Sequence, residues 1–172
     1  MATRSIPILG FATKPDDSGD CWFEPADIEG ANGFFKGMVL IFKNSGTDVE
    51  CFGRFGVPDD YVGSPKLVIR WTTTAVSGDV EWGIAYRAVG GNDTESLDQA
   101  TAQESLLTGN NDTAPSITDE RMVYEIDLTA SNFAIDDTVD FIFSREGADA
   151  GSGDTIAAKV RVYELRFQYS DV

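Results

Sequence analysis

The clearest pattern in the chain is an alternation of apolar and polar positions over two consecutive stretches, 66–76 and 79–88. Successive side chains of a β-strand point to opposite faces, so this alternation predicts two strands that each bury one face. Ser77-Gly78 between them is typical of a tight two-residue turn, because glycine tolerates a positive φ. The pattern therefore predicts a long β-hairpin.

The register of this hairpin defines one apolar face. It places the following residues opposite one another: Ile69 and Tyr86, Trp71 and Ile84, Thr73 and Trp82. The apolar face then consists of Leu67, Ile69, Trp71, Trp82, Ile84 and Tyr86. A face so rich in aromatic side chains must be covered, and a second sheet is the natural partner. Both tryptophans are therefore predicted to be core residues rather than sugar-stacking ones.

The remainder of the chain predicts further short strands that are separated by polar turns. They are expected over 38–43, 49–55, 103–108, 122–128, 139–144 and 155–169, with a helical turn over 94–102. In the last strand the apolar residues change from even to odd positions, so a β-bulge near Val162-Tyr163 would place both sets on the core face. The predicted fold class is all-β: an antiparallel, jelly-roll-like β-sandwich of about eight strands.

Residues 1–33 lack this periodicity and contain three prolines. They are predicted to form an extended, irregular N-terminal arm, and residues 34–172 are predicted to form the sandwich domain. An arm rich in apolar side chains must pack on something, and a neighbouring subunit is the favoured partner. The candidate intersubunit contacts are Ile6, Ile8, Leu9, Phe11, Trp22 and Phe23.

Composition excludes several functions. The net charge is −16, from 29 acidic and 13 basic residues, so neither nucleic acid nor an anionic membrane surface is an expected partner. The absence of histidine excludes Ser-His-Asp and Cys-His catalysis as well as histidine-based zinc sites. The sequence leaves open whether Cys21 and Cys51 pair, and two reduced thiols are the favoured interpretation.

Candidate chemistry is sparse in the rest of the chain. Acidic pairs such as Asp59-Asp60 and Asp136-Asp137 fill most turns, so no pair is singled out as the two carboxylates of a glycosidase. The loop 146–154 offers oxygen ligands for calcium but lacks the full EF-hand spacing. We therefore predict no enzyme, no metal and no cofactor. No stretch reaches the roughly 20 apolar residues of a membrane span, and no signal peptide is expected.

Three motifs carry a resemblance to a known class of proteins. They are Val57-Pro58-Asp59-Asp60-Tyr61-Val62-Gly63 with Leu67-Val68-Ile69-Arg70-Trp71, then Ser77-Gly78-Asp79-Val80-Glu81-Trp82 with Thr94-Glu95-Ser96-Leu97-Asp98, and finally Phe141-Ile142-Phe143-Ser144-Arg145-Glu146-Gly147. Over residues 38–169 the sequence resembles jelly-roll virion structural proteins of tailed bacteriophages. Residues 1–37 lie outside the resemblance.

The resemblance implies a non-enzymatic capsid decoration or cement protein that stabilises the shell by bridging capsomers. Its implied partners are the major capsid protein and two further copies of itself in a homotrimer, and its implied location is the outer capsid surface after synthesis in the host cytoplasm. It carries over no catalytic residue. The alternative is a carbohydrate-binding β-sandwich on a tail fibre or another virion appendage, with a surface glycan as ligand and with Phe34, Phe35 and Tyr61 as exposed aromatic residues.

Overall fold

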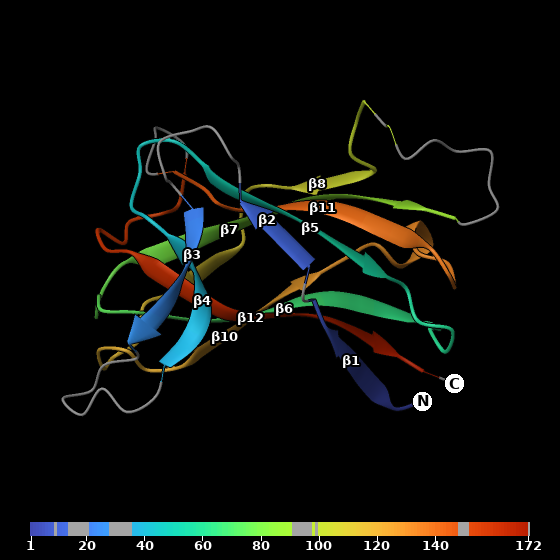
Figure 1. Ribbon diagram of the computed structural model, residues 1–172, viewed down its shortest axis with the longest axis horizontal. Helices are drawn as coiled ribbons and strands as arrows, with labels where there is room; N and C mark the ends of the chain where they lie inside the picture. The colour runs from blue at the N-terminus through green and yellow to red at the C-terminus, as the bar shows by residue number, and fades with distance from the viewer. Residues whose placement is uncertain are drawn as a thin grey trace.

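The computed structural model describes residues 1–8, 10–13, 21–27, 36–90, 98, 100–147 and 152–171. These residues form two antiparallel sheets that lie face to face, with a single 3-10 turn, η1 (Ala130–Asn132), among the described elements (Figure 1). The predicted all-β, two-sheet sandwich is therefore confirmed. In this described part, no helix is both long and apolar enough to cross a membrane.

Sheet A has the strand order β10-β6-β12-β4-β3, and β1 pairs with β12 as well. Its strands are β1 (Thr3–Pro7), β3 (Cys21–Asp27), β4 (Lys36–Phe42), β6 (Gly63–Thr73), β10 (Met122–Asp127) and β12 (Val160–Ser170). The two chain ends lie close together because Thr3 on β1 pairs with Ser170 on β12 (Figure 1). Sheet A thus combines strands from the beginning, the middle and the end of the chain.

Sheet B has the strand order β2-β5-β11-β7-β8, and β9 pairs with β7 beside β8. Its strands are β2 (Gly10–Thr13), β5 (Val49–Gly56), β7 (Asp79–Val89), β8 (Glu104–Leu106), β9 (Asn111–Thr113) and β11 (Thr138–Arg145). The central strand β11 pairs with β5 on one side and with β7 on the other. This three-stranded centre carries the outer surface that is described in the next subsection.

The predicted hairpin over 66–88 is wrong in its pairing and right in its buried faces. β6 belongs to sheet A and β7 to sheet B, so the connection through Gly78 (φ +95°) crosses between the sheets. The six residues predicted for the apolar face are all buried. Trp71 and Trp82 meet edge to face across the sandwich, with ring centroids 5.7 Å apart. The alternation of apolar and polar residues indicates which side chains are buried. It does not indicate which strands pair with each other.

The last strand confirms the predicted bulge. The register of β12 against β6 shifts between Val162 and Glu164. Val162 and Leu165, on either side of the shift, are both buried in the core. Tyr163 was expected on the core face as well, and this is wrong. As the extra residue of the bulge, it packs instead with Val39 and Ile41 in a small separate cluster.

The irregular conformation expected for residues 1–33 is not observed in their described part. β1 and β3 belong to sheet A and β2 to sheet B, which raises the number of described strands to twelve. Proline is tolerated here because Pro25 lies on β3, an edge strand whose outer side needs no ladder hydrogen bond. Pro7 is the last residue of β1. The division of the chain at residue 33 stays a prediction.

Candidate functional site

The outer face of sheet B carries an ordered set of side chains at its centre. Along β5, β11 and β7, alternate residues such as Cys51, Phe143 and Ile84 point into the core, so their neighbours point outward. The register then places outward-pointing residues side by side in rows across the three strands. One row is apolar and consists of Phe52, Ile142 and Ala85.

The adjacent row is charged and consists of Arg54, Asp140 and Arg87. A third row lies on the other side of the charged row and consists of Gly56, Thr138 and Val89. With strands about 4.8 Å apart, each row spans roughly 10 Å across the sheet. The apolar row and the charged row together form a surface that has an apolar strip beside hydrogen-bonding groups. We call this surface the sheet B groove.

Apart from Arg54, the residues of the two rows line a concavity with a volume of about 460 Å³. Its floor includes the outward residues of the three central strands, and one wall is formed by Ala100, Thr101 and Ala102, which precede β8. This volume falls within the roughly 300–1,000 Å³ of small-molecule sites, which are mostly apolar and carry a few polar groups. The groove therefore has both the size and the lining of a ligand site.

The wall of the groove is fixed by hydrogen bonds to β7. Gln103 donates its backbone N–H to the Tyr86 carbonyl at 2.8 Å, and its side-chain oxygen accepts from Ala88 N at 3.1 Å. On β8, the Glu104 carboxylate accepts from the Tyr86 hydroxyl and from Thr129 Oγ1, the latter at 2.6 Å. Burial and the nearby Glu104 raise the pKa of Tyr86, so its hydroxyl stays a donor. The wall is thus held in place before any ligand binds.

The charged row is partly neutralised within the sheet. Arg54 donates from Nε and Nη2 to the two carboxylate oxygens of Asp140, at 2.5 and 2.9 Å. This hydrogen-bonded contact and the charge of Asp140 raise the pKa of Arg54. Arg87 donates to the Thr101 carbonyl at 3.5 Å and so reaches the wall. Two cations and one anion leave this row with a net charge of +1 in a chain of −16.

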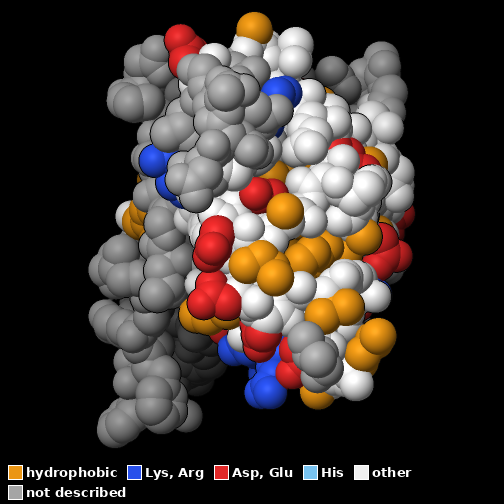
Figure 2. Space-filling model, turned by 90° about the vertical axis from the view of Figure 1, so that its right-hand side faces the viewer, with side chains coloured by type: hydrophobic (Ala, Val, Ile, Leu, Met, Phe, Trp, Pro, Cys, Tyr) orange, Lys and Arg blue, Asp and Glu red, His pale blue; other side chains and the backbone are white. Residues whose placement is uncertain are grey.

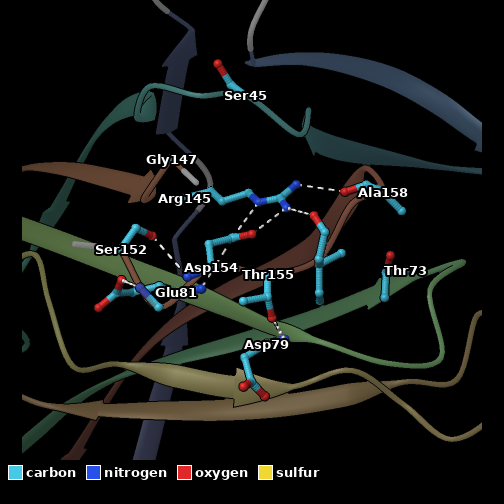
Figure 3. A network of polar contacts seen from close by, with 12 residues as sticks. Ser45, Thr73, Asp79, Glu81, Arg145, Gly147, Ser152, Asp154, Thr155 and Ala158 are labelled. Atoms are coloured by element: carbon cyan, nitrogen blue, oxygen red, sulfur yellow. Dashed lines mark hydrogen bonds and ion pairs between the residues drawn. The ribbon is translucent and has the colours of Figure 1, made fainter. Parts of the chain in front are cut away.

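The opposite end of β11 carries a buried polar network (Figure 3). Arg145 donates two hydrogen bonds to the carboxylate of Asp154, at 2.7 and 2.8 Å, and a third to the Ala158 carbonyl at 2.8 Å. Asp79 and Thr155 exchange two hydrogen bonds beside them. The network ties the segment that leads into β12 to the start of β7 and the end of β11, so we assign it to the stability of the fold.

This network also bears on the calcium hypothesis for the loop 146–154. Both carboxylate oxygens of Asp154 accept hydrogen bonds from Arg145, so in this structure they are engaged in an ion pair rather than oriented toward a calcium site. Residues 148–151 of the loop lie outside the described residues. Within the described ranges, no group of three or more cysteine and acidic residues could hold a metal ion.

The residues predicted for intersubunit contacts have different locations. Ile8 is 3% exposed in the main core, and Ile6 packs against that core. Trp22 packs against the small cluster of Val39 and Ile41 and lies 4.8 Å from the Lys159 ammonium group, whereas Phe23 is 41% exposed. Leu9 and the side chain of Phe11 lie outside the described part. Their contact role stays a prediction.

The aromatic residues expected to bind a glycan do not meet in the described structure. Tyr61 is 7% exposed and packs in the core against Phe133, Phe167 and Tyr169, which corrects its predicted exposure. Phe167 and Tyr169 on β12 and Phe133, which follows η1, account for this burial. Phe34 and Phe35 lie outside the described residues. Three aromatic residues line the groove, and Tyr86 and Phe141 among them belong to the core. The third is Phe52, which points outward from β5 and which the sequence predicts only as part of a strand.

The two cysteines agree with the reduced interpretation. Cys21 on β3 and Cys51 on β5 are free and buried. Burial raises the pKa of the Cys51 thiol, and the neighbouring Cys21 thiol raises it further. Both thiols are therefore small buried groups between the two sheets.

One side of the molecule, in the space-filling view, shows acidic side chains that border a band of hydrophobic ones (Figure 2). The exposed large apolar side chains of the described residues include Val62, Ile117, Val123 and Ile135.

Comparison with known proteins gives fold information only. No protein-family model and no curated protein matches the sequence. The structure is similar to an isomalto-dextranase from Arthrobacter globiformis T6 complexed with panose, with a TM-score of 0.52 and 13% identity over 96% of this chain and 23% of that one. It is also similar to an exo-β-1,3-galactanase from Phanerochaete chrysosporium with galactose, with a TM-score of 0.50 and 8% identity over 97% and 29% of the chains.

A family 35 carbohydrate-binding module from Clostridium thermocellum matches along almost its whole length, with a TM-score of 0.47 and 11% identity over 95% of this chain and 97% of that one. The chain spans about a quarter of the length of the isomalto-dextranase and the galactanase. At these identities the likeness shows the fold. The isomalto-dextranase and the galactanase support the sandwich fold of the resemblance, and the comparisons show no virion family.

Proposed function

We propose that this chain binds a carbohydrate in the sheet B groove without cleaving it. The observation that carries the proposal is one concavity that is lined by the apolar row of Phe52, Ile142 and Ala85 and by Asp140 and Arg87 of the charged row. Arg54, the third residue of that row, is bound to Asp140. A sugar ring has an apolar face and a rim of hydroxyl groups. The apolar row offers a surface for the face, and the charged row offers donors and acceptors for the hydroxyls.

The fold neighbours support carbohydrate as the ligand class. The two structures with the higher TM-scores were solved with panose and with galactose. The groove itself supports binding rather than hydrolysis. Among its described lining residues, Asp140 is the only carboxylate, and Arg54 engages both of its oxygens. A glycosidase requires two carboxylates across the scissile bond, about 5–9.5 Å apart.

The proposal is tested by calorimetric titration with a panel of soluble oligosaccharides that includes panose and galactose oligomers. We expect Phe52→Ala to weaken the binding of the best ligand about tenfold, because it removes the aromatic ring of the apolar row. Phe23→Ala is the matched control, since it removes an exposed phenyl ring from β3 on the other sheet. Equal affinities of the parent and Phe52→Ala, or no binding across the panel, would contradict the proposal.

Absence of catalysis is measured with the same panel. We expect no increase in reducing ends after prolonged incubation with the parent protein. An increase that Asp140→Asn abolishes would instead assign a catalytic role to this carboxylate. The capsid role, the homotrimer, the contact with a major capsid protein and the location on a virion receive no support from the comparisons. They stay predictions. Detection of this chain at stoichiometric copy number in purified particles would support the location on a virion.

A further inference from the structure

A second, smaller pocket lies on the outer face of the other sheet. Its volume is about 200 Å³, and its lining residues are Val39, Thr72, Asp119, Arg121, Arg161 and Tyr163. Pockets for drug-sized molecules measure roughly 300–1,000 Å³, so this one suits a smaller ligand. None of its lining residues belongs to the sheet B groove. We call it the sheet A pocket.

The base of the sheet A pocket is apolar. Val39 and Ile41 on β4 are buried, and Trp22 and Tyr163 pack against them, so they form a cluster separate from the main core. The bulge in β12 creates this arrangement, because the extra residue places the Tyr163 ring on the outer face. The pocket therefore offers the Tyr163 ring and the Val39 side chain to the body of a ligand.

The rim of the pocket is a rigid turn that precedes β10. Asp119 has a left-handed backbone (φ +62°), which is unusual for a residue with a Cβ. Its N–H donates to the Thr73 carbonyl at 2.9 Å, and its carboxylate accepts from Arg161 at 3.0 Å. Thr72 Oγ1 donates to the Glu120 carbonyl at 2.7 Å. These contacts hold the turn in one conformation and so position the next residue, Arg121.

Two polar groups at the pocket are left without partners among the described residues. The Tyr163 hydroxyl is shielded from solvent and has no hydrogen-bond partner, although buried hydroxyls are normally paired. Burial raises the pKa of Tyr163 while the charge of Arg121 lowers it, with a net rise, so the hydroxyl is a neutral donor. Arg121 is exposed and makes no ion pair within the described part of the chain. A hydroxyl donor and a guanidinium group thus share one apolar pocket.

We propose that the sheet A pocket binds a small monocarboxylate with an apolar body, of about the size of benzoate. Its carboxylate accepts hydrogen bonds from the Arg121 guanidinium and the Tyr163 hydroxyl, and its apolar body lies against Val39. The charges of Arg121, Arg161 and Asp119 sum to +1, which favours an anion locally. A neutral analogue of the same shape leaves the arginine without a charged partner, so the pocket discriminates by charge. The proposal is independent of carbohydrate binding.

The test is an NMR titration of the intact chain with sodium benzoate and, separately, with benzamide. We expect saturable shifts of the backbone amide signals of Thr72, Arg161 and Tyr163 with benzoate, and binding of benzamide at least about tenfold weaker. The absence of a saturable shift at these amides, or equal affinities for the two compounds, would overturn the proposal.

Variants separate recognition from folding. Arg121→Gln is expected to weaken benzoate binding about tenfold, because it removes the charged partner from the rim. Tyr163→Phe is expected to weaken it a few fold without lowering thermal stability, since the hydroxyl it removes has no partner. Arg4→Gln on β1 is the matched control and leaves the affinity unchanged. If Arg121→Gln and Tyr163→Phe both bind benzoate as tightly as the parent, the assignment is wrong.

Discussion

Two arginine–aspartate pairs on sheet B share their chemistry and differ in burial. Arg145 and Asp154 are joined by two hydrogen bonds, and their side chains are only 2% and 1% exposed. Arg54 and Asp140 are also joined by two hydrogen bonds, and their side chains are 58% and 40% exposed. Arg145 ends β11 and Asp140 lies within it, so each pair has one member on this strand.

The difference in burial gives the two pairs different roles. Charges that have been removed from water must remain paired, because an isolated buried charge is very unfavourable. Arg145 and Asp154 are therefore bound to each other whatever the solution contains. Water competes for Arg54 and Asp140, so a ligand in the sheet B groove can compete for them as well. The same pair of residue types stabilises the fold at one end of β11 and offers exchangeable hydrogen bonds at its centre.

The largest expected effect comes from breaking the buried pair. Asp154→Ala leaves the Arg145 guanidinium buried without its anion, and we expect a loss of about 3–5 kcal/mol in the free energy of unfolding. For a chain of this size that corresponds to a fall of roughly 6–20 °C in Tm. Urea and thermal unfolding measure the effect. Asp140→Ala is the matched control and should change stability by only a small fraction of this loss.

A replacement of both partners sharpens the same comparison. In Arg145→Met with Asp154→Leu, no charge is left buried, so the double variant is expected to be more stable than Asp154→Ala alone. If Asp154→Ala and Asp140→Ala cost the same, burial is not what separates the two pairs.

An intermediate effect is expected from Glu146, which follows Arg145 and is buried beside other acidic groups. Burial is the main cause that raises the pKa of Glu146 from 4.5 to about 7, and the charges of Asp48 and Glu81 add to it. The hydrogen bond from Ser144 opposes this rise in part. The folded state therefore holds a proton that the unfolded state releases above pH 4.5. The resulting stabilisation is complete below that pH and is lost as the pH rises through about 7.

Glu146→Gln removes this ionisation and keeps the shape of the side chain. At pH 8 we expect the variant to gain about 1–2 kcal/mol in unfolding free energy over the parent, and at pH 4 we expect almost no difference. Urea unfolding of both proteins at the two pH values measures it. A gain of equal size at both pH values would show that the ionisation of Glu146 is not responsible.

The buried faces of the sandwich could be predicted from the sequence, but the pairing of the strands could not. Trp71 and Trp82 alternate with polar neighbours, so the pattern identifies both as core residues. The same pattern is produced whether the two strands lie side by side in one sheet or face each other across two sheets. The bulge in β12 was predictable because the apolar positions change parity at Val162, and such a change needs an extra residue.

The sheet B groove was less accessible to prediction. The one indication in the sequence was an apolar residue at an outward position. Phe52 is such a residue, because Cys51 and Phe55 on the same strand face the core. Its meaning depends on Ile142 and Ala85, which lie far away in the sequence and join Phe52 only through the registers of β11 with β5 and β7. Periodicity within one strand carries no information on register between distant strands. The charged row could not be predicted for the same reason, because its residues also lie on three different strands.

The smallest expected effect concerns the exposed pair, which a double-mutant cycle isolates. Arg54→Gln, Asp140→Asn and the double variant should show a weak coupling at low salt, because water already competes for both side chains. In 1 M NaCl the Debye length falls to about 3 Å, so the coupling should vanish, whereas the loss caused by Asp154→Ala should persist. Urea unfolding of the four proteins at both salt concentrations measures it. A strong coupling that salt does not reduce would mean that Arg54 and Asp140 are held as firmly as the buried pair, and the charged row could then not exchange hydrogen bonds with a ligand.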